Sequence, residues 1–322
     1  MIDINKAIAA LNWKKEPQGL YEPIAYILAS GGKRLRPTLA LTAAEAIMNG
    51  GLINGDAIEK TLPAALALEV FHNFTLLHDD LMDKADVRRG QPTVHVKWNN
   101  NTAILSGDQM LIEAYKLLSD VPADKLPQVL KWFNEMATGV CEGQQYDVDF
   151  EHMCQVTIDD YMKMIELKTS VLIANAMRIG GYIAGATPAQ QQALYQYGLH
   201  IGLAFQIQDD ILDVYGDPNT FGKAIGGDIC CNKKTCLLIE AMETADPESR
   251  AELLQWLMTS DRNEEKIQAV TAIYNRLGVR ETCESVMEEH TANALAQLDK
   301  LPANAATERL RVLAEQLTTR KN

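Results

Sequence analysis

The sequence predicts an all-α protein. Apolar residues recur at helical spacing along most of the 322 residues, whereas alternating runs rich in Val, Ile and Thr are nearly absent. Hydrophobic residues make up 47% of the chain, which is ample for a sizeable buried core. No Ser/Gly-rich linker or low-complexity tract divides the sequence, so we expect one domain that spans residues 1–322.

Turn-forming residues predict where the helices end. The stretches between them are about 12 to 25 residues long and keep helical periodicity, so we expect a helix in each. Glycine, asparagine and proline interrupt the apolar pattern at residues 31–32, 49–55, 99–101, 122–127, 187–188 and 216–227.

Charge and cysteine usage exclude several classes of protein. The formal net charge of −13 argues against a broad nucleic-acid-binding surface, which needs an excess of Lys and Arg. The N-terminal segment MIDINKAIAALNWKK has no apolar core of signal-peptide length, and the most apolar later stretch is interrupted by Asn175 and Arg178. We therefore expect a cytoplasmic protein without a membrane anchor. No Cys-x-x-Cys pair occurs, and we expect free thiols at Cys141, Cys154, Cys230, Cys231, Cys236 and Cys283.

Two segments share the pattern Asp-Asp-x-x-Asp at the C-terminal end of an apolar helical run: LLHDDLMDKAD at residues 76–86 and QIQDDILDVYGD at residues 206–217. On a helix Asp79 and Asp83 are about 40° apart, and the same holds for Asp209 and Asp213. Like charges at this spacing repel, so a bound cation is the natural compensation. Mg²⁺ suits these carboxylates because it prefers oxygen ligands and commonly adds water and phosphate oxygens.

Other interpretations of the aspartates remain open at this point. A single cluster of this kind is often a solvated helix end, although two copies inside apolar segments favour a bound cation. A calcium loop is excluded because no glycine follows in the required register.

Basic residues gather in short clusters near the acidic segments. Arg grips a phosphate with parallel donors and Lys supplies a compact point charge, so the clusters favour a phosphate-bearing substrate, although each alone could be a solvated face. Neither GxxxxGK[ST] nor GxGxxG occurs, so nucleotide-binding loops of those types are not supported. The clusters comprise Lys33, Arg34 and Arg36; Arg88 and Arg89; Lys168 with Thr169 and Ser170; and Lys223, Lys233 and Lys234.

Taken together, these motifs resemble those of the trans-isoprenyl diphosphate synthase family, and they occur in the family's order over nearly the whole chain. The resemblance implies a helical-bundle isoprenoid synthase fold with a central active-site cavity, and a homodimer. The motifs are GGKRLRP at 31–37, HDDLMDKADVRRGQPTVH at 78–95, GQQYD at 143–147, LKTS at 167–170, FQIQDDILDVYGD at 205–217, GKAIGGD at 222–228 and NKKT at 232–235.

The resemblance also implies a role for individual residues. The Mg²⁺ ions, three per active site with substrate bound, would be held by Asp79, Asp83 and Asp209, with support from Asp80 and Asp213. Lys168 and Lys223 join the first three aspartates as the catalytic set. The allylic diphosphate would contact Arg88, Lys168, Thr169, Gln206, Lys223 and Lys233. Isopentenyl diphosphate would be held by Gly32, Lys33, Arg36, His72 and Arg89.

The implied reaction is the Mg²⁺-dependent head-to-tail condensation of isopentenyl diphosphate with dimethylallyl, geranyl or farnesyl diphosphate. Mg²⁺ and Lys would neutralise the departing diphosphate, so that the allylic C–O bond ionises to a carbocation. The double bond of isopentenyl diphosphate would then attack, and loss of a proton would leave a chain five carbons longer. The protein would supply positioning and exclude water.

Two features depend more on the resemblance than on periodicity. A lone histidine such as His72 in an apolar helix is more often a core residue, but it lies about 20° from Asp79 on the helical wheel and matches a substrate position. Phe71, Phe74 and Thr75 precede the first motif, where the family has the floor of the chain-length pocket. This arrangement resembles the geranylgeranyl type, so we expect a twenty-carbon product, with a fifteen-carbon product as the next alternative.

Rival functions predict different motifs. A class I terpene cyclase would combine Asn, Ser or Thr with Glu in its second metal motif and would not need Lys33, Arg36 and Arg89. A catalytically silent subunit of a heteromeric synthase would be expected to lack part of a motif, and none is missing here.

Overall fold

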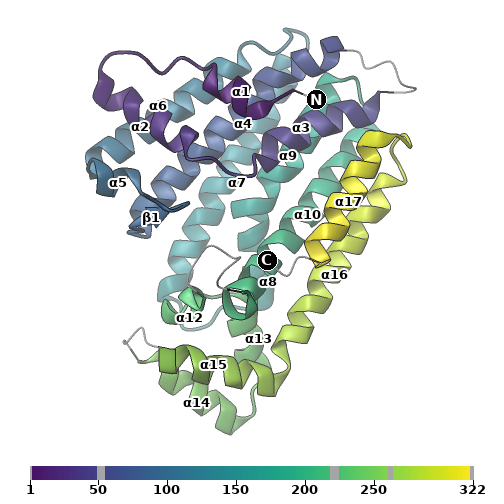
Figure 1. Cartoon of the computed structure of the whole chain (residues 1–322). Coiled ribbons are helices and arrows are strands. Elements are labelled where there is room, and N and C mark those ends of the chain that lie inside the picture. The colour runs from purple at the N-terminus through teal and green to yellow at the C-terminus, as the bar shows by residue number, and fades with distance from the viewer. Residues whose placement is uncertain (1, 49–54, 218–224, 260–263, 320–322) are drawn as a thin grey trace. The chain divides into compact units, whose positions relative to one another are not determined.

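The computed structural model describes residues 2–48, 55–217, 225–259 and 264–319 (Figure 1). The described chain is mainly helical, which confirms the all-α prediction. Contacts between Cα atoms divide it into two compact units. The first unit comprises Met1–Phe133, Ala176–Gln192 and Pro302–Ala306, and the second comprises Asn134–Asn175, Ala193–Leu301 and Thr307–Asn322. The expectation of a single domain over residues 1–322 stays a prediction.

In the first unit, the long helix α4 packs against α3 and α6, and α2 packs against α6 (Figure 1). Fully buried Ala64, Ala65 and Ala67 on α4 present little bulk, which allows close helix packing. The elements of this unit are α1 (Ile4–Ala9), α2 (Gln18–Ala29), α3 (Leu35–Ile47), α4 (Gly55–Met82), β1 (Val87–Arg88), β2 (Gln91–Pro92), α5 (Val94–Lys97) and α6 (Asn100–Leu118).

A short antiparallel hairpin, β1–β2, follows the first aspartate motif. Its two turn residues, Arg89 and Gly90, have φ values of 54° and 73°. Positive φ at both central residues is the geometry that suits the twist of a two-residue hairpin loop. The helical periodicity of the sequence did not predict this hairpin, which places Arg88 on a strand and Arg89 in the turn.

Several helices of the second unit begin with side-chain caps. Thr157 and Asp160 form a reciprocal capping box at the start of α8, and Thr235 accepts a hydrogen bond from the amide of Leu238 in α13.

The remaining elements are α7 (Leu126–His152), α8 (Ile158–Ile165), the π-helical η1 (Glu166–Ser170), α9 (Val171–Ile183), α10 (Pro188–Tyr215), α12 (Gly227–Cys230), α13 (Cys236–Thr244), α14 (Pro247–Leu257), α15 (Glu264–Leu277), α16 (Val279–Leu298) and α17 (Ala305–Thr319). Of these, α7, α9, α10 and α17 contribute residues to both units.

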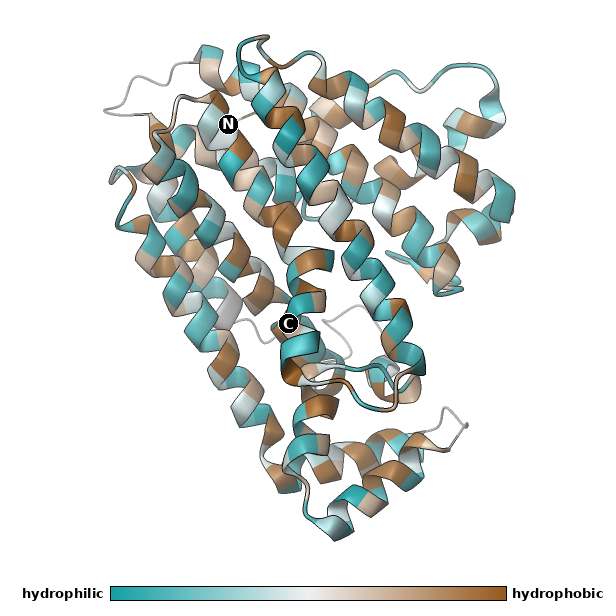
Figure 2. Ribbon diagram, turned by 180° about the vertical axis from the view of Figure 1, so that it is seen from behind, coloured by the Kyte–Doolittle hydropathy of each residue, from teal (hydrophilic) through white to brown (hydrophobic). Residues whose placement is uncertain are grey.

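The core of the second unit forms where α8, α10, α13, α15 and α16 bury their apolar faces. Leu237 on α13 and Ile273 on α15 are completely buried. Burying a side chain of this size stabilises the fold by roughly 1.5–3 kcal/mol relative to leaving it exposed. Figure 2 shows hydrophobic residues interleaved with hydrophilic ones along the helices, as expected when each helix buries one face.

The cysteines are free thiols, as predicted; Cys236 and Cys283 are buried, whereas Cys141, Cys154 and Cys231 are exposed. Across the described ranges, none of the helices is both long enough and apolar enough to cross a membrane.

Candidate active site

The first aspartate motif lies where α4 ends. Asp79 and Asp80 belong to the last turn of α4, and the amide of Asp83 donates to the carbonyl of Asp79 at 2.9 Å. This bond continues the helical turn, so Asp79 and Asp83 lie one turn apart, as the spacing predicts. The Asp79 carboxylate is half-buried and Asp83 is exposed.

The middle carboxylate of this motif is held by the hairpin. Arg88 donates from Nε to Oδ1 of Asp80 at 2.6 Å, and its Nη2 lies 3.7 Å from Oδ2 of Asp79. Burial raises the pKa of Asp80, and the charge and hydrogen bond of Arg88 oppose that rise. Arg88 is thereby fixed beside the two aspartates.

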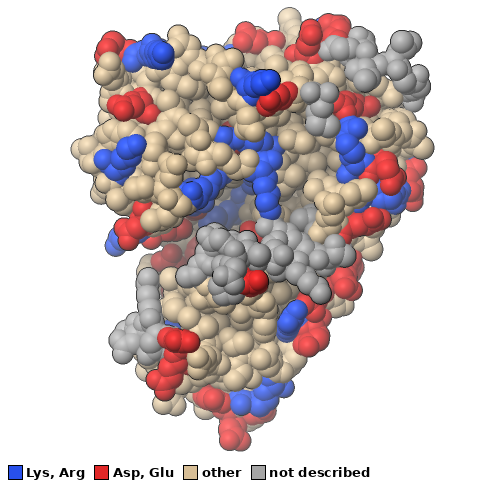
Figure 3. Space-filling model, viewed as in Figure 1, with Lys and Arg blue, Asp and Glu red and all other residues tan. Residues whose placement is uncertain are grey.

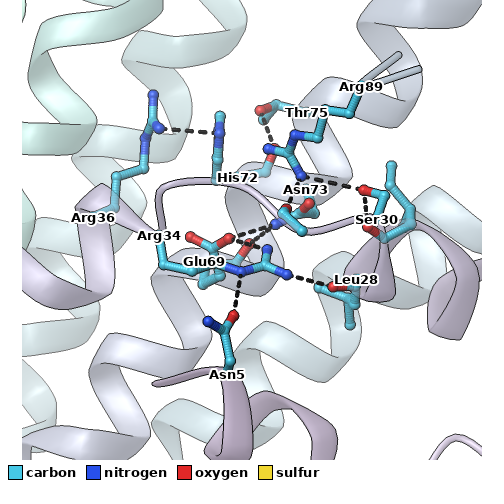
Figure 4. Close-up of polar contacts among 12 residues, drawn as sticks. Asn5, Leu28, Ser30, Arg34, Arg36, Glu69, His72, Asn73, Thr75 and Arg89 are labelled. Carbon is cyan, nitrogen blue, oxygen red and sulfur yellow. Dashed lines mark hydrogen bonds and ion pairs between the residues drawn. The ribbon is translucent and has the colours of Figure 1, made fainter. Parts of the chain in front are cut away.

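The GGKRLRP loop is attached to α4 by a buried ion pair (Figure 4). Arg34 Nη1 donates to Oε1 of Glu69 at 2.7 Å, and both side chains are almost fully buried. Asn73 Nδ2 donates to the same Glu69 oxygen at 3.0 Å, and Arg34 also reaches Oδ1 of Asn5 and the carbonyl of Leu28. A buried charge requires such partners, so Arg34 anchors the loop rather than forming a solvated face.

Arg36 and His72 meet on the other side of this anchor, with Arg36 Nη1 3.0 Å from His72 Nε2 (Figure 4). Burial lowers the pKa of Arg36 to about 10. Burial also lowers the pKa of His72 well below its usual value, and the charges of Arg36, Arg89, Arg88 and Arg34 lower it further. His72 is therefore neutral and accepts at Nε2 from the guanidinium. Several cations surround one neutral imidazole, which is an arrangement suited to an anion.

Arg89 packs against the glycines of the loop. Its Nη1 donates to Oγ of Ser30 at 3.2 Å and to the carbonyl of Gly31. A Cβ on Gly32 would lie 2.8 Å from Cζ of Arg89, and Gly32 has a φ of 123°. Only glycine fits there without strain. Lys33 is exposed and, with Gly32, lines a cavity of about 190 Å³.

The residues predicted to form the chain-length pocket lie in the aromatic part of α4. Phe71 is buried, with ring centroids 5.5 Å from Phe74 and 5.3 Å from Phe133. Phe74 is half-buried and packs edge-on against His78 at 4.9 Å, and the Thr75 hydroxyl donates to the carbonyl of residue 72. Phe71 is thus part of the core, whereas Phe74 and Thr75 keep partial exposure.

The second aspartate motif, on α10, is anchored differently. Asp210 is buried and its Oδ2 accepts from the Tyr161 hydroxyl at 2.7 Å and from the Cys236 amide at 3.3 Å. Burial, together with the negative charge of Asp228, raises the pKa of Asp210 to about 7. Asp209, which precedes it, is half-buried.

Asp213 holds the segment that follows α10. Its Oδ2 accepts from the Asp228 amide at 3.0 Å, and its carbonyl accepts from the Gly226 amide at 2.6 Å. Lys233 comes later in the same segment; its amide donates to the Asp228 carbonyl at 2.9 Å and its Nζ lies 3.9 Å from Oδ1 of Asp228. Lys223 lies outside the described residues.

The LKTS motif forms the π-helix η1, and π-turns inside helices are frequently found at functional sites. Its widened backbone needs glycines beside it, because a Cβ on Gly143 would lie 2.2 Å from the Lys168 amide nitrogen and one on Gly202 would lie 2.6 Å from Cα of Ser170. Lys168 Nζ donates to Oδ2 of Asp147 at 2.5 Å. The Thr169 hydroxyl donates to Oε1 of Gln206 at 3.1 Å, which brings those two predicted ligands together.

Sequence reasoning missed the residues that position the predicted ligands. Asp147 and Glu69 each pair with a basic residue of a motif, and Asp210 joins α8, α10 and α13. A signal existed for two of them: Asp147 closes the GQQYD motif, and Glu69 is an isolated acid in an apolar run, where a carboxylate needs a partner.

The donor set suits a hard divalent cation bound together with a substrate. In the part of the chain that the structure describes, no group of three or more His, Cys, Asp and Glu side chains could hold a metal ion. Mg²⁺ commonly uses one or two carboxylates plus phosphate oxygens, and Asp79 with Asp83 offers such a pair. On the face drawn in Figure 3, Lys and Arg form separate small groups among acidic and neutral atoms, which fits discrete phosphate contacts.

Comparison with known proteins gives the family. The model of the polyprenyl synthetase family matches residues 17–274. The chain belongs to this family. It is 42% identical over 74% of its length to the geranylgeranyl diphosphate synthase of Methanosarcina mazei, of which the match covers 72%. It is 35% identical to the geranylfarnesyl diphosphate synthase of Natronomonas pharaonis, with 98% of this chain and 94% of that one covered.

A solved structure supports the same assignment. A crystal structure of a geranylgeranyl pyrophosphate synthase matches all of this chain and all of that one, with a TM-score of 0.90 and 42% identity. The predicted resemblance and the predicted class of enzyme, a trans-prenyltransferase, are therefore confirmed.

Proposed function

We propose that the protein catalyses the Mg²⁺-dependent head-to-tail condensation of isopentenyl diphosphate with allylic diphosphates to a short-chain all-trans prenyl diphosphate. The observation that carries this proposal is the cationic group of Arg36 and Arg89 around neutral His72. It offers an anion site that uses no carboxylate, in addition to the two aspartate motifs. A terpene cyclase, which takes one diphosphate substrate, has no use for it.

The aspartate motifs are assigned to the allylic diphosphate. Asp79, Asp83 and Asp209 would hold Mg²⁺, which when bound neutralises charge on the departing diphosphate; we propose three ions per site. Asp80 and Asp213 would support these ligands through Arg88 and through the Gly226–Thr235 segment. The allylic diphosphate would contact Arg88, Lys168, Thr169, Gln206, Lys233 and, outside the described residues, Lys223.

The chain's own residues would then act by charge and position. Arg88 and Lys168, each held by a carboxylate, would stabilise the diphosphate as the allylic C–O bond breaks and its electrons leave with the oxygen. Arg36, Arg89, Lys33 and His72 would hold isopentenyl diphosphate so that its double bond forms the new C–C bond. The released diphosphate would take the proton that is lost, which restores an alkene.

Phe74 and Thr75 support a product of twenty carbons, geranylgeranyl diphosphate, with farnesyl diphosphate as the second candidate. Phe74 is a half-buried aromatic residue of α4 just before the first aspartate motif, and the next residue, Thr75, is small. The family resemblance is what assigns this position to the end of the growing chain.

Product analysis tests the proposal. Purified protein is incubated with Mg²⁺, labelled isopentenyl diphosphate and each of dimethylallyl, geranyl and farnesyl diphosphate, and the products are resolved by chain length. Elongation that ends at twenty carbons is expected. A stop at fifteen or twenty-five carbons would keep the reaction and refute the pocket assignment, whereas no incorporation by folded protein would favour a silent subunit or a cyclase.

We also propose the homodimer that the resemblance implies, formed through α6. Large hydrophobic side chains are exposed along this helix, and an apolar face of this kind is typical of a subunit interface. They are Ile104, Leu105, Ile112 and Tyr115, exposed by 45%, 59%, 50% and 38%. Light scattering during size-exclusion chromatography should give twice the monomer mass for the wild type and the monomer mass for Leu105→Glu. Met258→Glu, a control at an exposed residue of the second unit, should remain a dimer.

A further inference from the structure

A lysine that no motif contains is buried beside the segment that carries Lys233. Lys266, on α15, is only 1% exposed, although a lysine is rarely buried to this extent. Its Nζ donates to Oδ1 of Asn232 at 2.7 Å and to the carbonyl of Thr259 at 3.2 Å. Burying an ammonium group costs free energy unless hydrogen bonds compensate for the lost water. The groups that Lys266 contacts therefore indicate its structural role.

Asn232 is the link between this lysine and the diphosphate-binding residue next to it. Its Nδ2 donates to the carbonyl of Leu257, at the end of α14, at 2.9 Å. Its backbone has a φ of 55°, a left-handed conformation that asparagine tolerates better than most residues. The Asn232 side chain thus joins the segment that contains Lys233 to α14 and to α15. Lys233 is the next residue along the chain, so the backbone conformation of Asn232 sets where Lys233 begins.

The charge of Lys266 is favourably placed for this task. Leu257 is the last residue of α14 and Thr259 follows its C-cap, where exposed carbonyls attract a cation. The ammonium therefore binds one end of α14 while it holds Asn232. Asp213 accepts two bonds from the beginning of the Gly226–Cys236 stretch and Asp210 accepts one from the Cys236 amide at its end. Lys266 holds Asn232 between these two ends.

We propose that Lys266 is a positioning residue that acts through Asn232 to place Lys233 against the allylic diphosphate. This inference rests on the proposed function, because it assigns Lys233 to that diphosphate. Lys266 itself lies in the core of the second unit and touches no substrate.

The test uses two variants and a control on the same pair of helices. Lys266→Met keeps the length of the side chain and removes the ammonium, and Asn232→Gly keeps the left-handed backbone and removes both side-chain bonds. Arg276→Gln breaks the surface ion pair between α15 and α14, which joins Arg276 Nη2 to Oε2 of Glu252 at 2.6 Å, without touching the segment. Asn232→Asp keeps the acceptor for Lys266 but loses the donor to the Leu257 carbonyl, so it separates the two side-chain bonds.

Both Lys266→Met and Asn232→Gly should raise KM for the allylic diphosphate by between about tenfold and 100-fold, with KM for isopentenyl diphosphate unchanged. The Lys266→Met/Asn232→Gly double variant should lose no more than either single variant, and Arg276→Gln should retain the wild-type KM values. Asn232→Asp, which keeps one of the two side-chain bonds, should lie between the wild type and Asn232→Gly. Equal changes in both KM values, or the same loss in Arg276→Gln, would refute positioning and indicate general loosening of the unit. If Lys266→Met does not fold, Asn232→Gly decides alone.

Failure of the proposed function would look different, because wild-type protein would then form no product. In that case the binding of inorganic pyrophosphate with Mg²⁺, followed by calorimetry, decides the positioning role. Weaker binding by Lys266→Met than by Arg276→Gln would support it, and equal binding would overturn it.

Discussion

The two aspartate motifs have the same pattern but are held in place by different partners. In the first motif the second aspartate, Asp80, accepts from the guanidinium of Arg88. In the second motif the corresponding residue, Asp210, accepts from a tyrosine hydroxyl and a backbone amide. The second position of each motif is therefore an anchor between elements, and the first positions, Asp79 and Asp209, are half-buried near the C-terminal ends of long helices.

The difference also appears in the pKa values of the two anchoring carboxyls. Burial raises both, but the cation of Arg88 opposes the rise for Asp80, whereas the negative charge of Asp228 adds to it for Asp210 and brings its pKa to about 7. The first motif thus orients the guanidinium of Arg88. The second organises neutral groups that fix a segment of backbone.

The largest effect is expected from the first aspartate of each motif. Asp79→Ala and Asp209→Ala should each lower kcat by about 10²–10³-fold or more, because each removes a proposed ligand of the ions that would neutralise the leaving group. Circular dichroism and thermal melting should match the wild type. Near-wild-type turnover in either variant would show that its motif does not bind the metal.

The aromatic residues upstream of the motifs sharpen the comparison. Phe74→Ala should give longer products than the wild type, because it removes the side chain assigned to the pocket floor. Phe205→Ala, its matched control before the second motif, should leave product length unchanged. Chromatography of the dephosphorylated products measures both, and an unchanged product from Phe74→Ala would refute the pocket assignment.

Stability should separate the roles of the second positions. Asp210→Ala leaves the Tyr161 hydroxyl and the Cys236 amide without their acceptor, so it should lower the free energy of unfolding by about 1–3 kcal/mol. Asp210→Asn keeps one acceptor oxygen and should cost less, as measured by urea denaturation. If the two variants were equally destabilised, the carboxylate charge rather than hydrogen bonding would be the anchor.

The smallest effect is expected from a pair of histidines in the second unit, His200 and His290. This pair should make the folded protein less stable in acid. Nδ1 of His200 lies 3.0 Å from Nδ1 of His290. Burial lowers the pKa of both; the charge of His290 lowers that of His200 further, and the charge of Glu289 opposes both shifts. Because the folded pKa values lie below the usual 6.5, the unfolded chain binds more protons on acidification.

The pair of His200 and His290 therefore contributes stability that is fully present above pH 6.5, the usual histidine pKa. That stability is lost as the pH falls from this value through the lowered pKa values of the folded protein. The melting temperature should fall between about pH 7.5 and about pH 5, and it should fall by less in His290→Gln. An identical pH dependence in the variant would exclude the pair as a source of acid sensitivity.

Helical periodicity predicted the fold class, and the turn residues at 31–32 and 187–188 lie where helices are interrupted. Periodicity could not predict the hairpin of Val87–Pro92, because two residues per strand leave no pattern to read. It also could not predict the π-turn at Lys168, which depends on glycines from two other helices, Gly143 and Gly202. Contacts between distant segments, such as Asn232 with Lys266, have no local signature.

The sequence predicted which residue types form the site better than it predicted how they are held. It identified Arg36, His72 and Arg89, which the structure brings to one cationic group around the imidazole. It treated Arg34 as one more basic residue of the same cluster. Only the burial of Glu69 beside it distinguishes an anchor from a ligand.

The most direct test of the central claim, that both motifs hold one diphosphate through Mg²⁺, is a binding measurement without turnover. Calorimetry with geranyl thiolodiphosphate, in which sulfur replaces the bridging oxygen, should show binding by the wild type with Mg²⁺ and none with EDTA. Asp79→Ala and Asp209→Ala should each weaken binding by about tenfold or more, and the double variant should be little worse than either. Wild-type affinity in one of the single variants would contradict the account, because one motif would then bind the diphosphate without the other.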